Sequence, residues 1–282
     1  MALPDYLIIG AMKCGTSTLA VQLGAQPGLF MTTPKEPNFF SDDAIYSRGA
    51  TWYQALFDDA KPGDIKGEAS THYTKLPTHP DTLSRLRNLL EAPKIIYLIR
   101  NPVERAVSHY IHEWTMGVMT EDIGTAFDIH PELTAYSCYG RQIEPWVAAF
   151  GADSIHLASL EEIERQPQVV LDAVCGFLGY TGTPVWQREQ ARVNVSAERI
   201  RRFPLHGLLI DNPLAARLRR ALVPQGLRDR IKRGRQIQDR PHLSPERIRA
   251  LETVFAQDRA VLSSMFPGQG PLTTSYPFLG AP

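Results

Sequence analysis

The sequence predicts an α/β protein in which helices flank a parallel β-sheet. Two observations lead to this fold class. Short apolar runs alternate with segments in which apolar residues recur at helical spacing, and two of these runs end at residues typical of a helix start. Alternating strands and helices favour parallel pairing, because parallel strands need a crossover connection. With 282 residues, the chain is expected to form one domain over residues 1–282.

The expected strands are the apolar runs at residues 6–9, 94–99 and 154–157, with a further short strand at 65–70. Their length and their polar boundaries are typical of buried strands. The stretch 27–50 is rich in proline, aspartate and serine, so we expect it to be irregular.

The expected helices follow from apolar residues at spacings of three and four. Gly179 marks the end of one of them, since glycine is favoured just past a helix terminus. The full set comprises a helix opening near Thr16, a helix at 82–90, one beginning at Pro102, and helices at 139–150, 168–178 and 244–265.

The first strand runs into a turn that is bounded by Gly10 and Gly15 and contains Lys13. Hydroxyl residues at 16–18 then open a helix. Backbone N–H groups at a helix start lack intrahelical partners, and the helix dipole adds positive charge there. The lysine adds a full charge, so the turn predicts an anion site. It is not a Walker A loop, because Thr16 stands where that motif has its lysine.

The strand at 94–99 is followed by a second group of polar residues. Arg100 ends the strand, and Asn101 and Pro102 are favoured at the N-cap and first position of a helix, with Glu104 completing a capping-box-like start. Ser108 follows two turns into this helix, so arginine and serine could hold one phosphate. An arginine paired with a carboxylate and a surface serine is the alternative.

Taken together, these segments resemble the sulfotransferases that use 3′-phosphoadenosine 5′-phosphosulfate (PAPS). Residues 10–19 resemble their 5′-phosphosulfate loop, residues 97–110 their 3′-phosphate motif, and residues 35–40 the segment with the catalytic glutamate of the heparan-sulfate-type branch. The resemblance spans most of residues 5–180. It implies a P-loop-like sulfotransferase fold, PAPS as co-substrate with 3′-phosphoadenosine 5′-phosphate (PAP) as product, no metal ion, and sulfuryl transfer to a hydroxyl or amine.

Residue roles also follow from the resemblance. Lys13 would be the catalytic cation and Glu36 the base, with Glu68 and His72 as further candidates. A structural role remains open for both of these, and Pro37 is expected to keep Glu36 in an extended backbone. The cofactor-binding residues would be Lys13, Cys14, Gly15, Thr16, Ser17, Thr18, Arg100 and Ser108.

Residues 199–235 are strongly basic, with ten arginines and one lysine against two aspartates. A solvated helical face explains most of these charges. The resemblance places a basic loop that covers the cofactor or the substrate in this segment, at Arg233, Gly234 and Arg235.

Composition bounds the partners. The formal net charge is zero, which argues against binding to nucleic acid or to a membrane surface. No apolar run reaches the length of a membrane span. Cys14, Cys138 and Cys175 fit no disulfide framework or metal spacing, and residues 1–5 leave no room for a signal peptide, so a cytoplasmic location is expected.

Two other functions remain open from the residues alone. One is a P-loop nucleotide kinase or NTPase, against which the position of Lys13 and the lack of a clear magnesium carboxylate argue. The other is a nucleotide-binding module without catalysis. The acceptor could be a carbohydrate, lipid alcohol, phenol or amine, and the oligomeric state is open.

Overall fold

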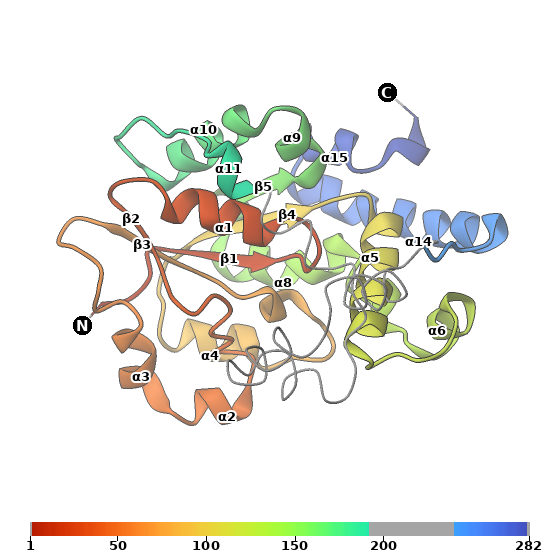
Figure 1. The fold of residues 1–282 in the computed structure, drawn as a ribbon, viewed down its shortest axis with the longest axis horizontal. Coiled ribbons are helices and arrows are strands. Elements are labelled where there is room, and N and C mark those ends of the chain that lie inside the picture. Colours follow the sequence, from red (N-terminus) through yellow and green to blue (C-terminus); the bar gives the residue numbers. More distant parts are fainter. Residues whose placement is uncertain (1, 192–239, 281–282) are drawn as a thin grey trace, which may run out of the picture.

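The computed structural model describes residues 2–191 and 240–280. The basic segment 199–235, with Arg233, Gly234 and Arg235, lies outside the described residues. At the centre is a parallel five-stranded sheet in the order β2-β3-β1-β4-β5 (Figure 1). The strands are β1 (Tyr6–Gly10), β2 (Leu29–Met31), β3 (Ile65–Ala69), β4 (Lys94–Ile99) and β5 (Ile155–Ser159). The predicted α/β class with a parallel sheet is confirmed.

Helices lie on both sides of the sheet, with α1 on one side and α4 on the other (Figure 1). The α-helices are α1 (Thr16–Gly24), α2 (Asp43–Tyr46), α3 (Gly49–Ala55), α4 (Thr82–Arg87), α5 (Pro102–Met116), α6 (Ile123–Ile129), α7 (Glu132–Ala135), α8 (Tyr139–Phe150), α9 (Leu160–Arg165), α10 (Pro167–Leu178), α11 (Arg188–Ala191), α14 (Pro245–Met265) and α15 (Pro271–Thr274). Short 3₁₀ helices are η1 (Thr71–Thr74), η2 (Ala152–Ser154) and η5 (Pro277–Leu279).

The central strand β1 is buried along its whole length, as its unbroken apolar sequence predicts for a strand covered on both faces. It pairs with β3 and β4 on its two sides. Gly67 of β3 lies opposite Tyr6, and a Cβ atom at 67 would come within 2.1 Å of the tyrosine ring. A glycine is therefore required where these two strands meet.

Two expectations about local structure are wrong. The stretch 27–50 is not irregular throughout, because it contains β2, α2 and the start of α3. A strand as short as β2 shows no alternation that a sequence pattern could reveal. Helix α4 ends at Arg87 rather than at residue 90, and Leu89 and Leu90 both donate their N–H groups back to Leu86 O in a closing turn.

The order of the strands predicts where along the sheet a ligand binds. After β1, the chain builds β2 and β3 on one side and then crosses to β4 and β5 on the other. In parallel sheets, ligands bind beyond the carboxyl ends of the strands where the order reverses. Gly10 and Ile99 end β1 and β4 at this point, and the Ala11 N–H donates to Leu98 O at 2.7 Å. Both predicted anion motifs therefore begin side by side.

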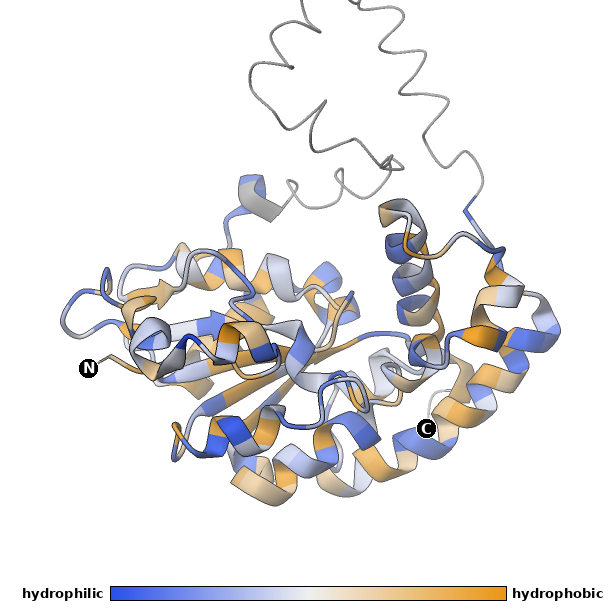
Figure 2. Ribbon diagram, turned by 90° about the horizontal axis from the view of Figure 1, so that it is seen from below, coloured by the Kyte–Doolittle hydropathy of each residue, from blue (hydrophilic) through white to orange (hydrophobic). Residues whose placement is uncertain are grey.

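Helix α14 packs on α8, and its Asp258 side chain binds the first turn of α8. Asp258 accepts hydrogen bonds from the N–H groups of Gly140 (2.7 Å) and Arg141 (3.0 Å). In Figure 2 the strands in the middle are largely orange, whereas the outer helices mix apolar and polar residues. None of the helices in the described part of the chain combines the length and apolar character needed to cross a bilayer.

Candidate active site

The loop after β1 leaves the first turn of α1 open to a ligand. Gly15 precedes the helix in a left-handed conformation (φ 88°), and among the described residues no side chain caps α1 and none in its first turn is acidic. Lys13 also has a positive φ of 70°. The first N–H groups of α1 lack intrahelical partners and carry the positive end of the helix dipole. This arrangement suits an anion, as predicted from Lys13 and the helix start that follows the first strand.

Cys14 lies inside this loop with its side chain fully buried. Its Sγ atom is 3.5 Å from the Tyr139 hydroxyl, and burial raises the pKa of the thiol to about 11. The side chain is therefore a neutral thiol at physiological pH. It fills space beneath the loop, and the Cys14 N–H donates to Ala11 O at 3.2 Å.

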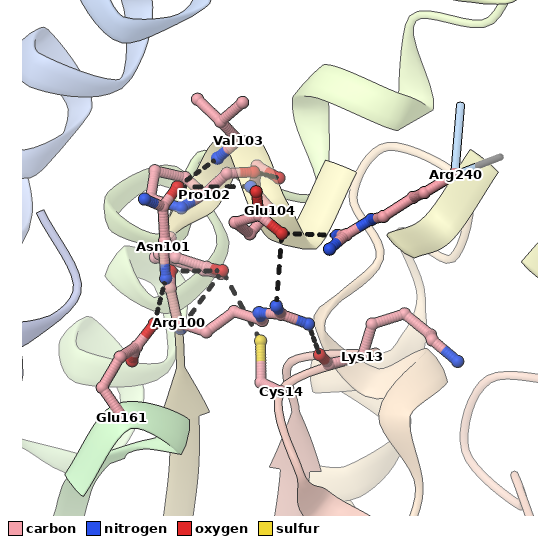
Figure 3. A network of polar contacts seen from close by, with 11 residues as sticks. Lys13, Cys14, Arg100, Asn101, Pro102, Val103, Glu104, Glu161 and Arg240 are labelled. Atoms are coloured by element: carbon pink, nitrogen blue, oxygen red, sulfur yellow. Dashed lines mark hydrogen bonds and ion pairs between the residues drawn. The ribbon is translucent and has the colours of Figure 1, made fainter. Parts of the chain in front are cut away.

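Arg100 connects the two predicted anion motifs (Figure 3). Its Nη1 atom donates to Lys13 O at 3.3 Å, and its Nη2 atom lies 3.7 Å from Glu104 Oε2. Its Nε atom is buried and has no hydrogen-bond partner among the described residues. Ser108 is half-buried on α5. A guanidinium with an unused donor, held against the lysine loop, fits an oxyanion.

At the start of α5, only one half of the predicted capping box forms among the described residues. Asn101 Oδ1 accepts from the N–H groups of Val103 (3.0 Å) and Glu104 (3.2 Å), which confirms Asn101 as the N-cap. The expected return bond from Glu104 is wrong. Glu161 Oε1 from α9 accepts the Asn101 N–H instead, at 2.7 Å. A carboxylate from a distant helix thus completes the cap and leaves Glu104 for other partners.

Glu104 lies between two guanidinium groups (Figure 3). Besides Arg100, it accepts a hydrogen bond from Nη2 of Arg240. Sequence reasoning missed Arg240 because it placed the basic covering loop at 233–235. The one available signal was an arginine a few residues beyond that segment.

Glu36 lies on the loop after β2, close to the start of α1. The extended backbone expected for it is wrong, since its φ is 60°. The Glu36 N–H donates to Ala69 O at 2.9 Å, and this bond to the end of β3 fixes the turn. Lys13, Glu36 and Asn38 are the non-glycine residues of the described chain with positive φ, and all three lie on these loops. Such unfavourable conformations cluster at functional sites.

The Glu36 carboxylate is surrounded by cations and donors. Lys35 Nζ lies 2.8 Å from its Oε1 atom, and Thr71 Oγ1 donates to the same oxygen at 3.3 Å. Burial raises the pKa of this carboxyl, but Lys35, His72 and Lys75 together outweigh burial, so the pKa lies below its usual value. Glu36 is therefore ionised at neutral pH, as a general base must be.

Glu68 is fully buried, whereas Glu36 is partly exposed. It accepts hydrogen bonds from the hydroxyls of Tyr53 (2.9 Å), Ser70 (2.9 Å) and Tyr73 (2.8 Å), and burial raises its pKa to about 7. Ser70 Oγ in turn accepts the Asn38 N–H at 3.0 Å. Through Ser70, Glu68 thus helps to hold the loop that carries Glu36.

The candidate His72 and the buried His109 are both neutral at physiological pH. Burial lowers the pKa of His72 to about 4, its ring stacks on His79 with centroids 4.8 Å apart, and its Nδ1 atom has no hydrogen-bond partner among the described residues. His109 on α5 is buried against Tyr136, and burial lowers its pKa to about 4 as well. His72 lies near enough to Glu36 to influence its charge.

Comparison with known proteins identifies the family of this chain. A family described as "Sulfotransferase domain" matches residues 3–259. Mouse bifunctional heparan sulfate N-deacetylase/N-sulfotransferase 1 is 29% identical over 203 residues, which cover 64% of this chain and 22% of the relative. Mouse heparan sulfate glucosamine 3-O-sulfotransferase 6 is 29% identical over 184 residues, covering 62% and 52%. The chain thus spans at most about half the length of these two relatives.

Solved structures share the fold. A sulfotransferase from Alicyclobacillus acidocaldarius superposes with a TM-score of 0.66 at 23% identity, covering 94% of this chain and 96% of its own. Mouse sulfotransferase SULT7A1, complexed with PAP, gives a TM-score of 0.52 at 17% identity, covering 92% and 88%. The expected sulfotransferase fold is confirmed, and since the family match covers most of the sequence, the chain belongs to the sulfotransferase domain family.

Proposed function

We propose that this protein transfers a sulfuryl group from PAPS to a hydroxyl or amine of an acceptor and releases PAP. The observation that carries the proposal is the contact between the two anion motifs at one edge of the sheet. Arg100 at the end of β4 donates to the backbone of Lys13 in the loop before α1. One nucleotide with phosphate groups at both its 5′ and 3′ positions matches a pair of adjoining anion sites.

The residues present fit such a nucleotide. The first turn of α1 is free of capping and acidic side chains among the described residues, and the buried Nε atom of Arg100 lacks a partner there. We assign the 5′-phosphosulfate to Lys13 and the first N–H groups of α1, and the 3′-phosphate to Arg100 and Ser108. Arg240 is a further candidate at the 3′ end, because it shares Glu104 with Arg100.

PAPS supplies an activated sulfuryl group, and the protein supplies position and charge. As the S–O bond to the 5′-phosphate breaks and a bond forms from sulfur to the oxygen or nitrogen of the acceptor, negative charge grows on the leaving phosphate. Lys13 and the N–H groups of the loop meet that charge. The acceptor proton passes to Glu36, and a positioned general base contributes about two to four powers of ten in rate.

Glu36 is the better base of the two carboxylates. It is ionised, partly exposed and close to the loop that holds Lys13, whereas all three hydroxyl partners of Glu68 are buried with it. We therefore assign Glu68 a supporting role. We assign neutral His72 a place beside the base rather than the role of the base itself.

The acceptor class we propose is a carbohydrate, because the two mouse relatives described above are named for heparan sulfate. A small-molecule acceptor is the alternative. The cytoplasmic location and the metal-free reaction remain predictions, and the three cysteines, all free and buried, are compatible with a reducing compartment. The kinase or NTPase alternative loses support, because the chain belongs to the sulfotransferase family. It also has threonine at position 16, where a Walker A loop has lysine.

A thermal-shift titration tests the proposal. PAP and ATP are compared, each with magnesium and with EDTA. A ligand at a hundredfold excess over its Kd stabilises the folded state by about 2.7 kcal/mol. We expect PAP to raise the melting temperature equally with and without magnesium. Stabilisation by ATP alone, and only with magnesium, would assign the loop to a kinase or NTPase.

Two variants, Lys13→Ala and Glu36→Gln, distinguish an enzyme from a non-catalytic binding module. We expect both to lose PAP formation from PAPS in the presence of acceptor. If both bind PAP and neither changes turnover, the assigned roles are wrong.

A further inference from the structure

Lys35 connects the proposed phosphosulfate loop to the proposed base. Its Nζ atom donates to Ser17 Oγ at 2.9 Å and to Glu36 Oε1 at 2.8 Å. Ser17 belongs to the first turn of α1, where the 5′-phosphosulfate is assigned. A single ammonium group therefore contacts both halves of the site.

The backbone on either side of Lys35 is held in place. The Glu36 N–H is bound by Ala69 O and the Asn38 N–H by Ser70 Oγ, so the loop is fastened to the end of β3. The Lys35 side chain is only partly exposed, with 29% of its surface accessible. Because the backbone is fixed and the side chain has a flexible four-carbon stem, the ammonium group can change position. Its three N–H donors can serve more than one acceptor.

The charges around Lys35 change when an anionic ligand enters the loop. Without such a ligand, the Glu36 carboxylate is the anion that Lys35 contacts, and this pairing makes the carboxylate a weaker base. A phosphosulfate group at the start of α1 would bring a second anion to the Ser17 side of the same ammonium. The attraction that Lys35 now gives to Glu36 would then be shared with the cofactor.

We propose that Lys35 exchanges partners during the reaction, an inference that rests on the proposed function. In the free enzyme its ammonium pairs with Glu36. With PAPS bound, the ammonium donates to the phosphosulfate end, which stabilises the charge left on the 5′-phosphate and frees Glu36 to accept the proton of the acceptor. Lys35 stays protonated throughout, and the proton that Glu36 gains is the one the acceptor loses.

Nucleotide binding tests this exchange without any turnover. Isothermal titration compares PAP with adenosine 3′-monophosphate, which lacks the 5′ group, on the wild-type protein and on Lys35→Met. We expect Lys35→Met to bind PAP about tenfold more weakly, or about 1.4 kcal/mol, and to bind adenosine 3′-monophosphate as the wild type does. Lys35→Arg keeps the charge and should recover part of the PAP affinity.

Lys66→Met is the matched control, because it removes another lysine–carboxylate pair, with Asp5, away from the site. It should leave both affinities unchanged. Unchanged PAP affinity in Lys35→Met, or an equal loss for both nucleotides, would overturn the exchange. If the wild type itself fails to bind PAP, the proposed function fails, and the inference falls with it.

The pH profile gives a second readout that a purely structural lysine would not move. Glu36 faces Lys35, His72, Lys75 and, at a longer range, Glu68. Removing the Lys35 ammonium raises the pKa of the Glu36 carboxyl, so the acid limb of kcat/KM should move to higher pH in Lys35→Met. A limb that stays in place would contradict the pairing in the free enzyme.

Discussion

Glu36 and Glu68 stand at the same end of the sheet, yet their surroundings give them opposite properties. Glu36 is partly exposed beside an ammonium and has a lowered pKa. Glu68 is buried under three hydroxyl donors, and its pKa is raised to about 7. One carboxylate is therefore kept charged at the surface of the site, and the other serves the packing beneath it. Because the two residues are of the same type, we base the proposal of Glu36 as the base on its environment.

The largest effect that this comparison predicts is on turnover in Glu36→Gln. The amide keeps the shape of the side chain but accepts no proton, so PAP formation from PAPS and acceptor should fall by about two to four powers of ten. The melting temperature should change little. A variant with near wild-type turnover would remove Glu36 from the mechanism.

The next effect is on stability in Glu68→Leu. This change leaves the Tyr53, Ser70 and Tyr73 hydroxyls without their common acceptor, and buried donors left unpaired cost about 1–3 kcal/mol each. We expect the free energy of unfolding, measured by urea titration, to fall by about 3 kcal/mol in total. Glu36→Gln serves as the control, and equal stability of the two variants would contradict the assigned roles.

Stability should also depend on pH through Glu68. Its pKa is higher in the folded than in the unfolded protein, so its contribution is fully present below the unfolded value of 4.5 and is lost as pH rises through about 7. The expected loss is up to about 3 kcal/mol. Urea titrations at several pH values on wild type and Glu68→Gln measure it, and the two curves should differ in slope within this window. Parallel curves would refute a raised pKa.

The smallest expected effect concerns the link between the two carboxylates. Ser70 donates to Glu68 and accepts the Asn38 N–H, so Ser70→Ala should lower stability by about 1 kcal/mol and slow turnover a few-fold by loosening the Glu36 loop. Ser84→Ala, on the exposed surface of α4, removes a hydroxyl bond that plays no part in the site. Turnover that drops no further in Ser70→Ala than in this control would break the link.

The sequence predicted those parts of the site that depend on neighbouring residues. The loop around Lys13 and the start of α5 follow from glycine spacing, capping residues and strand ends, and these signals are local. Other contacts join segments that are distant in the sequence: Lys35 with Ser17, Glu161 with Asn101, and Arg240 with Glu104. They depend on how the sheet and its helices pack, which no spacing along the chain encodes.

The backbone at Glu36 shows the same limit at a single residue. Proline at 37 predicts an extended conformation for the residue before it. The hydrogen bond from the Glu36 N–H to the end of β3 belongs to the tertiary structure, and it coincides with a positive φ. Burial likewise separates Glu68 from Glu36, and the burial of each carboxylate depends on the tertiary structure.

The pH dependence of kcat/KM tests most directly which carboxylate is the base. PAP release from PAPS is followed with an acceptor found by screening sugars. With Glu36 as base, the rate should stay level from about pH 7 down to about pH 5, because its pKa lies below 4.5. A rate that falls about tenfold per pH unit below about pH 7 would instead report the raised pKa of Glu68 and contradict the account.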